Sequence, residues 1–108
     1  MSNLASCQII QNITPIEGAD SIETAHVLGW TVVIKKGEYK VGDKCCYVQI
    51  DTVMPDKPEF EFLRERKFRV RTIKLRKQLS QGLIVPLPVG KWNEGDNLTD
   101  LVGVKKYE

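Results

Sequence analysis

The stretch IETAHVLGWTVVIK, residues 22–35, is the clearest indication of a β fold, because its two halves have the pattern of β-strands. From Ile22 to Leu28 the residues alternate between two faces, and Gly29 then breaks or bulges the strand. From Trp30 to Lys35 the chain continues with a β-branched run, which favours a strand. The stretch therefore predicts two neighbouring strands.

The rest of the chain adds further strand signals on both sides of this stretch. Ala5–Thr14 reads as a long first strand that ends at Pro15, and Lys44–Ile50 reads as a third strand. Glu59–Arg66 has apolar residues at helical spacing, with acidic residues at its start and basic residues at its end, which suits the helix dipole. One short helix is expected there.

The last third of the chain contains two more strands. Phe68–Thr72 alternates strictly, and Ile73–Arg76 alternates out of phase, which predicts a β-bulge near the junction. Gly82–Pro86 reads as a final short strand, and Leu98–Val102 as one helical turn capped by Asn97.

This order of elements predicts the fold class. The expectation is a mostly β protein, a five-stranded Greek-key barrel of the OB type with one short helix between strands three and four. An SH3-like barrel is the alternative. Residues 1–103 are expected to form a single OB-fold nucleic-acid-binding domain, since the sequence contains no internal repeat or low-complexity segment.

Composition excludes several classes of protein. The 108 residues are 42% hydrophobic and 28% charged, which is neither a disordered nor a membrane composition. No apolar run approaches the ~20 residues of a membrane helix, so no membrane partner is expected. Cys45 and Cys46 are adjacent and Cys7 is remote, and without a C-x-x-C spacing they predict buried, reduced thiols in an intracellular protein.

Charge is concentrated in one stretch of the chain. Residues 64–77 hold eight basic residues and one acidic residue, a net charge of +7, while the remainder carries −5. Arginine binds phosphate with a two-pronged geometry and stacks on bases, so this stretch favours a nucleic-acid site over a merely solvated edge strand. Lys35 and Lys36 belong to a second, smaller basic cluster. The predicted RNA-binding residues are Arg64, Arg66, Lys67, Arg69, Arg71, Lys74, Arg76, Lys77, Lys35 and Lys36.

Catalytic motifs are absent from the sequence. The chain has one histidine, His26, and neither a phosphate-binding glycine loop nor a K-x-D-G-type lysine nucleophile motif. No catalytic residue and no metal ligand is therefore predicted. Trp30 and Tyr47 are candidate stacking residues, and core positions are favoured for both.

Several motifs together resemble a known family, the ATP-dependent RNA ligases of the Deinococcus type, in their N-terminal OB module. The resemblance covers nearly the whole chain from Leu4. It rests on Leu4-Ala5-Ser6, Ile16-Glu17-Gly18-Ala19-Asp20-Ser21-Ile22-Glu23, Leu28-Gly29-Trp30, Val33-Ile34-Lys35-Lys36-Gly37-Glu38, Val41-Gly42-Asp43, Ile73-Lys74-Leu75-Arg76 and Leu79-Ser80-Gln81-Gly82-Leu83. Lys77 departs from the pattern, because glycine is expected there.

The resemblance implies a function for a larger protein. In such ligases a nucleotidyltransferase domain follows in cis, uses ATP and a divalent metal, and joins a 3′-hydroxyl to a 5′-phosphate, typically at a nick in duplex RNA. Residues 104–108 resemble the start of the linker to that domain. The resemblance implies no cofactor in this domain itself, and nicked or duplex RNA as its partner. A free-standing tRNA- or RNA-binding OB protein, or an adaptor for an acidic protein, are the alternatives.

Overall fold

The computed structural model describes residues 3–107. Residues 1–2 of the predicted domain and residue 108 of the predicted linker lie outside these described residues. The strands are β1 (Ala5–Ile9), β2 (Asn12–Pro15), β3 (Ile22–Val27), β4 (Trp30–Lys35), β5 (Lys44–Val48), β6 (Thr52–Val53), β7 (Arg69–Val70), β8 (Thr72–Leu75), β9 (Gln78–Gln81), β10 (Leu83–Val85) and β11 (Lys105–Lys106). The helices are the 3-10 helix η1 (Pro58–Arg66) and the short α1 (Thr99–Val102).

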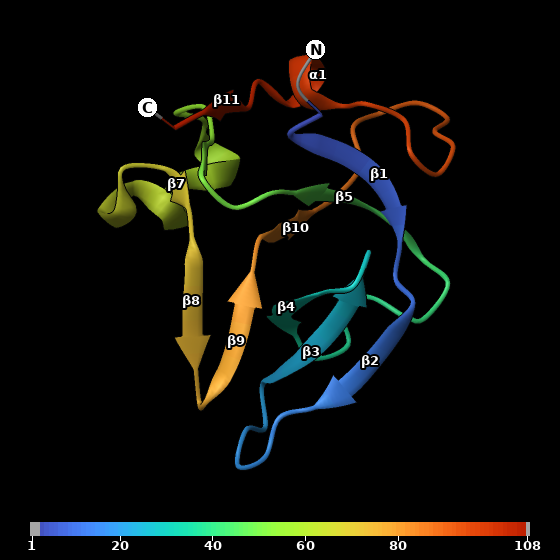
Figure 1. The fold of residues 1–108 in the computed structure, drawn as a ribbon, viewed down its shortest axis with the longest axis vertical. Coiled ribbons are helices and arrows are strands. Elements are labelled where there is room, and N and C mark those ends of the chain that lie inside the picture. Colours follow the sequence, from blue (N-terminus) through green and yellow to red (C-terminus); the bar gives the residue numbers. More distant parts are fainter. Residues whose placement is uncertain (1–2, 108) are drawn as a thin grey trace.

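Within residues 3–107 the strands form four antiparallel sheets. Their hydrogen-bonded orders are β1-β5-β10, β11-β6-β7, β2-β3-β4 and the hairpin β8-β9. Figure 1 shows the sheet β2-β3-β4 and the hairpin in the lower half of the molecule, with η1, α1 and the other sheets above them. The two halves are connected where consecutive strands, such as β1 and β2, belong to different sheets.

The prediction of one closed five-stranded barrel is not confirmed. The predicted first strand divides, because Ile10 N–H donates to Asp43 O while Gln11 N–H donates to His26 O, so the chain changes partner between them. Beside β4, β9 is held by Thr31 Oγ1 donating to Leu79 O and by Val33 N–H donating to Ser80 Oγ, both at 2.9 Å. Side-chain hydrogen bonds therefore link these two sheets.

A helical segment lies at nearly the predicted residues, Pro58–Arg66 against the expected Glu59–Arg66, but the strand order around it differs. It was expected between strands three and four, whereas η1 lies between β6 and β7 because the structure has more strands than the prediction. It is a 3-10 helix with Pro58 in its first turn and a kink at Phe60, where φ is −111°. Proline suits the start of a helix, and the kink explains why the segment does not continue as a regular α-helix.

Two hydrophobic cores lie on opposite faces of the sheet β1-β5-β10. Cys46 and Val48 of β5 pack into one core with Phe60 and Leu63 of η1. Cys45 and Tyr47 pack into the other, with residues of β3 and β4. Successive residues of β5 therefore face opposite cores, and both faces of this strand are buried.

Candidate nucleic-acid interface

The end of η1, strand β7 and the start of β8 surround a concave site, here called the basic hollow. It has a volume of about 400 Å³ and is lined by Glu65, Arg66, Lys67, Arg69, Arg71, Thr72 and Ile73. Four of these residues are basic and one is acidic. The hollow therefore brings four of the predicted RNA-binding residues together around one space.

A strained turn shapes this hollow. Lys67 and Phe68 both adopt left-handed backbone conformations, with φ of 55° and 61°. The turn is held by Phe68 N–H donating to Leu63 O and by Met54 N–H donating to Phe68 O. Two successive left-handed residues other than glycine are unfavourable, so packing around Phe68 must hold the chain as it turns from η1 into β7.

Arg69 is fixed within the hollow by an aromatic contact. Its guanidinium carbon Cζ lies 3.5 Å from the centroid of the Tyr107 ring. Its Nε is buried and has no hydrogen-bond acceptor among residues 3–107. The cation–π contact therefore orients a guanidinium that has donor capacity left over.

Arg64 lies outside the hollow and is paired with carboxylates. Its Nε donates to Glu61 Oε1 at 2.6 Å and its Nη2 donates to Asp56 Oδ1 at 3.0 Å. The hydrogen bond from Arg64 lowers the pKa of Glu61 and raises the pKa of Arg64 itself. The charge of Arg64 is therefore largely compensated before any ligand arrives, although its side chain is exposed.

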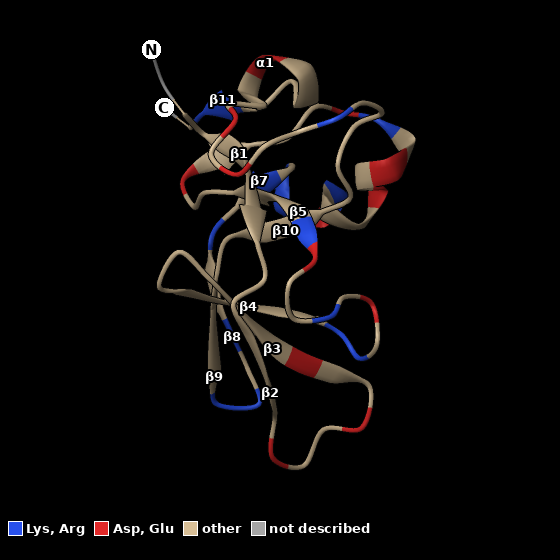
Figure 2. Ribbon diagram, turned by 90° about the vertical axis from the view of Figure 1, so that its right-hand side faces the viewer, with Lys and Arg blue, Asp and Glu red and all other residues tan. Residues whose placement is uncertain are grey.

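A second basic group lies at the tip of the hairpin β8-β9. Arg76 and Lys77 form its two-residue turn with φ of 48° and 68°, and Lys74 lies within β8 opposite Leu79. Figure 2 shows this turn in blue at the lower left, where β8 and β9 meet. The four residues of β8 span about 13 Å and separate Arg76 and Lys77 from the hollow, whereas Lys74 directly follows Ile73 of its lining.

Lys35 and Lys36 lie in a third region. Lys35 ends β4, and Lys36 N–H donates to Ser21 O at the edge of the same sheet. Lys35 lines a large apolar groove rather than the basic hollow. The structure therefore places four of the predicted site residues in the hollow, three on the hairpin β8-β9, Lys35 and Lys36 at the end of β4, and Arg64 apart from these, paired with carboxylates.

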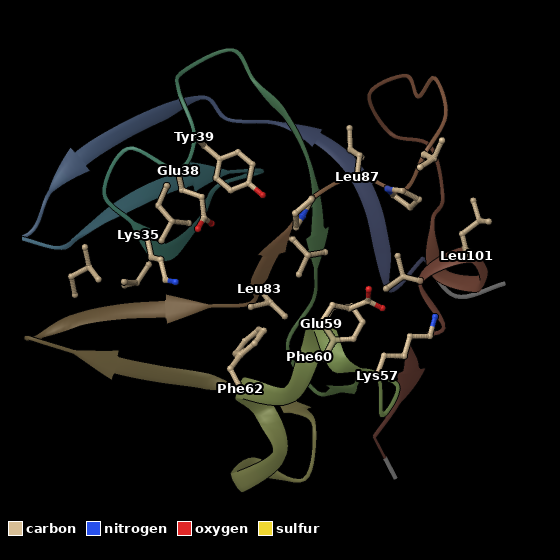
Figure 3. A pocket seen from close by; sticks show the side chains of 18 of the residues that line it. Lys35, Glu38, Tyr39, Lys57, Glu59, Phe60, Phe62, Leu83, Leu87 and Leu101 are labelled. Carbon is tan, nitrogen blue, oxygen red and sulfur yellow. The ribbon is translucent and has the colours of Figure 1, made fainter.

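The apolar groove lies between the hairpin, η1 and the turn after β4 (Figure 3). It has a volume of about 1100 Å³, and its charged lining residues are balanced: Lys35 and Lys57 against Glu38 and Glu59. Burial, with a smaller effect from Glu38, raises the pKa of Tyr39 on its wall to about 12. This groove has apolar surface but no excess of positive charge.

Tyr107 is a site residue that no sequence pattern identifies, because nothing near it in the sequence indicates a partner as distant as Arg69. Tyr47 is buried, and its hydroxyl donates to Gln81 O at 2.7 Å, so it is a core residue as favoured. Trp30 is 38% exposed at the start of β4.

Metal and thiol chemistry find little support in the described part of the chain. Among residues 3–107 no group of three or more histidine, cysteine or carboxylate side chains could hold a metal ion. The three cysteines are free and buried, and burial raises the pKa of Cys45 and Cys46 to about 12. Such thiols are unreactive. No helix within residues 3–107 is long and apolar enough to cross a membrane.

Comparison with known proteins assigns the fold to a family. The family description of an OB-fold domain matches residues 4–87. A search of curated proteins gives no match.

Solved structures add a more specific likeness. An apo mutant of the Naegleria gruberi RNA ligase is 39% identical with a TM-score of 0.90, over 98% of this chain and 35% of the ligase. The same ligase with PPi is 38% identical with a TM-score of 0.90, over 100% of this chain and 36% of the ligase. A mutant with AMP and Mn is 38% identical with a TM-score of 0.90, over 99% and 36%.

The chain thus spans about a third of the length of these ligases. The family model confirms the OB fold, and the solved structures confirm the resemblance to an RNA ligase module that the sequence motifs indicated. This chain belongs to the OB-fold domain family, in the form found within RNA ligases.

Proposed function

We propose that this chain is the RNA-engaging module of an ATP-dependent RNA ligase that seals 3′-hydroxyl and 5′-phosphate ends. The observation that carries the proposal is the basic hollow, where Arg66, Lys67, Arg69 and Arg71 surround one concave site. An excess of basic residues at a concave surface attracts the phosphates of a polyanion. On an OB domain of the ligase type, that polyanion is RNA.

The module binds the RNA backbone rather than its bases. Arginine and lysine contacts to phosphate fix the position of a nucleic acid without reading its sequence. The tip residues Arg76 and Lys77 supply a second, weaker contact, because they are exposed and stand apart from the hollow. Binding is therefore expected to tolerate any sequence and to weaken with salt.

The chemistry of sealing belongs to a partner domain. The related ligase structures are described with AMP, ATP and Mn, and this chain spans about a third of such proteins. A nucleotidyltransferase domain in cis would hold ATP and the metal, in an intracellular protein, with residues 1–103 as the OB domain. Residues 104–108 would begin the linker, and within them Lys105–Lys106 pair with β6 as β11.

A pair of matched double variants tests the proposal. Arg66→Gln with Arg71→Gln removes two positive charges from the hollow, and Arg76→Gln with Lys77→Gln removes two from the hairpin tip. Arg69 is avoided, because its stack on Tyr107 is also structural. The hollow variant is expected to weaken binding of a nicked RNA duplex about tenfold, and the tip variant less.

Fluorescence anisotropy with labelled RNA measures the affinity, and circular dichroism checks that the melting temperature is retained. All four substituted residues are exposed, so the fold is expected to survive. The proposal is wrong if the wild-type chain does not bind RNA, or if the hollow variant binds as tightly as the wild type.

A further inference from the structure

We infer that the basic hollow recognises a terminal phosphate monoester of RNA in preference to an internal phosphodiester. This inference rests on the proposed RNA-binding function and makes its ligand more specific. Three features support it: the basic side chains around the hollow, the fixed orientation of the Arg69 guanidinium, and the different shape of the hairpin tip.

The first argument is the convergence of charge. An internal phosphodiester carries one negative charge, whereas a phosphate monoester carries about −1.5 to −2 at pH 7 and has three strong acceptor oxygens. The hollow presents four basic side chains, from η1, the following turn, β7 and the residue between β7 and β8, around about 400 Å³, with Glu65 as the single carboxylate of its lining. Several basic side chains around one site suit a single dianionic phosphate. The monoanionic phosphates of an RNA backbone are better matched by basic side chains in an extended row.

The second argument is the guanidinium of Arg69. The ring of Tyr107 lies 3.5 Å from its Cζ, which restricts the side chain to one orientation. Its Nε is buried and has no acceptor among residues 3–107, so contact with a phosphate falls to the other two nitrogens of the guanidinium. A phosphate group with three free oxygens can accept several hydrogen bonds at once from a planar guanidinium and its neighbours.

The third argument is the hairpin tip, which has similar charge and a different shape. Arg76 and Lys77 project from an exposed two-residue turn, and neither residue lines the basic hollow or the apolar groove. Such side chains can contact phosphates along a backbone but cannot surround one. The hollow and the tip should therefore differ in preference for an end, although both attract RNA.

The test uses three RNA strands of one sequence, with a 5′-phosphate, with a 3′-phosphate, or with hydroxyls at both ends. The wild-type chain is expected to bind at least one phosphorylated strand about tenfold more tightly than the hydroxyl strand. Which phosphorylated strand is preferred identifies the end that is held. Saturating inorganic phosphate should abolish the preference, because it competes for the same group.

Matched variants and pH locate the preference. Arg66→Gln with Arg71→Gln should remove it, while Arg76→Gln with Lys77→Gln should retain it. The preference should also fall from pH 7.5 to pH 5, because a monoester gains a proton near pH 6 while arginine and lysine stay charged.

Two results overturn the inference: equal affinity of the wild type for all three strands, or a preference that survives in the hollow variant. Tight and equal binding of the three strands would remove this inference and leave the proposed function standing. Failure of every strand to bind would instead reject the proposed function.

Discussion

The basic hollow and the apolar groove are neighbouring concave sites with opposite compositions. The hollow has four basic residues and one acidic residue in a small space, whereas the larger groove balances two lysines with two glutamates on an apolar wall. Lys35 is a predicted RNA-binding residue, yet it lines the groove, where positive and negative charges are balanced. Local excess of charge, rather than the presence of a lysine, marks the surface suited to RNA.

One segment of the chain shapes both sites. Thr72 and Ile73 at the start of β8 line the hollow, and Leu75 at its end lines the groove. The hairpin that contains them is continuous with the core through Gly82, which links β9 to β10. Substitutions in and beside this hairpin therefore test how the structure shared by the two sites contributes to each of them.

The largest effect is expected from Gly82→Ala. A Cβ at residue 82 would lie 2.6 Å from Tyr47 Cε1 and 2.7 Å from Val48 O, and φ is +124°. Overpacking and backbone strain together should cost about 3 kcal/mol or more of unfolding free energy and disrupt both sites. Urea unfolding measures the loss.

Gly37→Ala is the matched control for this substitution. Gly37 has φ of +80°, and a Cβ at residue 37 would meet nothing within 4 Å, so only backbone strain is expected. Equal unfolding free energies for the two variants would show that the close approach to Tyr47 has no energetic importance.

A smaller effect, of opposite sign, is expected from Lys77→Gly. Lys77 has φ of 68°, a conformation that glycine adopts without steric cost, so the substitution should stabilise the fold by about 1 kcal/mol. Lys77→Gln removes the same charge and keeps the strain. Thermal melting should rank the glycine variant above the glutamine variant, while RNA affinity should be the same for both; equal melting temperatures would argue against strain at the tip.

Much of the sheet structure could be predicted from local patterns. The β-branched run predicts β4 with the bounds found, Trp30–Lys35. Strand β9 was missed because Gln78–Gln81 contains no β-branched or aromatic residue, and because the turn before it lacks the glycine or asparagine that marks a hairpin. The closed barrel failed for a related reason, since partner changes at Ile10 and Gln11 are not visible in a strand pattern.

The candidate site could be predicted in composition but not in arrangement. The excess of arginine between residues 64 and 77 is plain in the sequence. The pairing of Arg64 with Glu61, three residues earlier, could have been anticipated from helical spacing. The contact of Arg69 with Tyr107 brings together residues that are distant in the sequence, so a local pattern does not predict it. The separation of the hollow from the hairpin tip likewise depends on how the strands are arranged in the folded chain.

The salt dependence of RNA binding is the most direct measure of whether the basic hollow binds RNA through its phosphates. If about four phosphates are neutralised, log K for single-stranded RNA should fall with log salt at a slope of roughly −3. Arg66→Gln with Arg71→Gln should make the slope shallower, because the hollow then neutralises less phosphate charge. In the apolar groove, Phe62→Ser with Leu101→Ser alters side chains that are 63% and 58% exposed and should leave the slope unchanged. A wild-type slope near zero, or the same slope in the hollow variant and the wild type, would contradict the account.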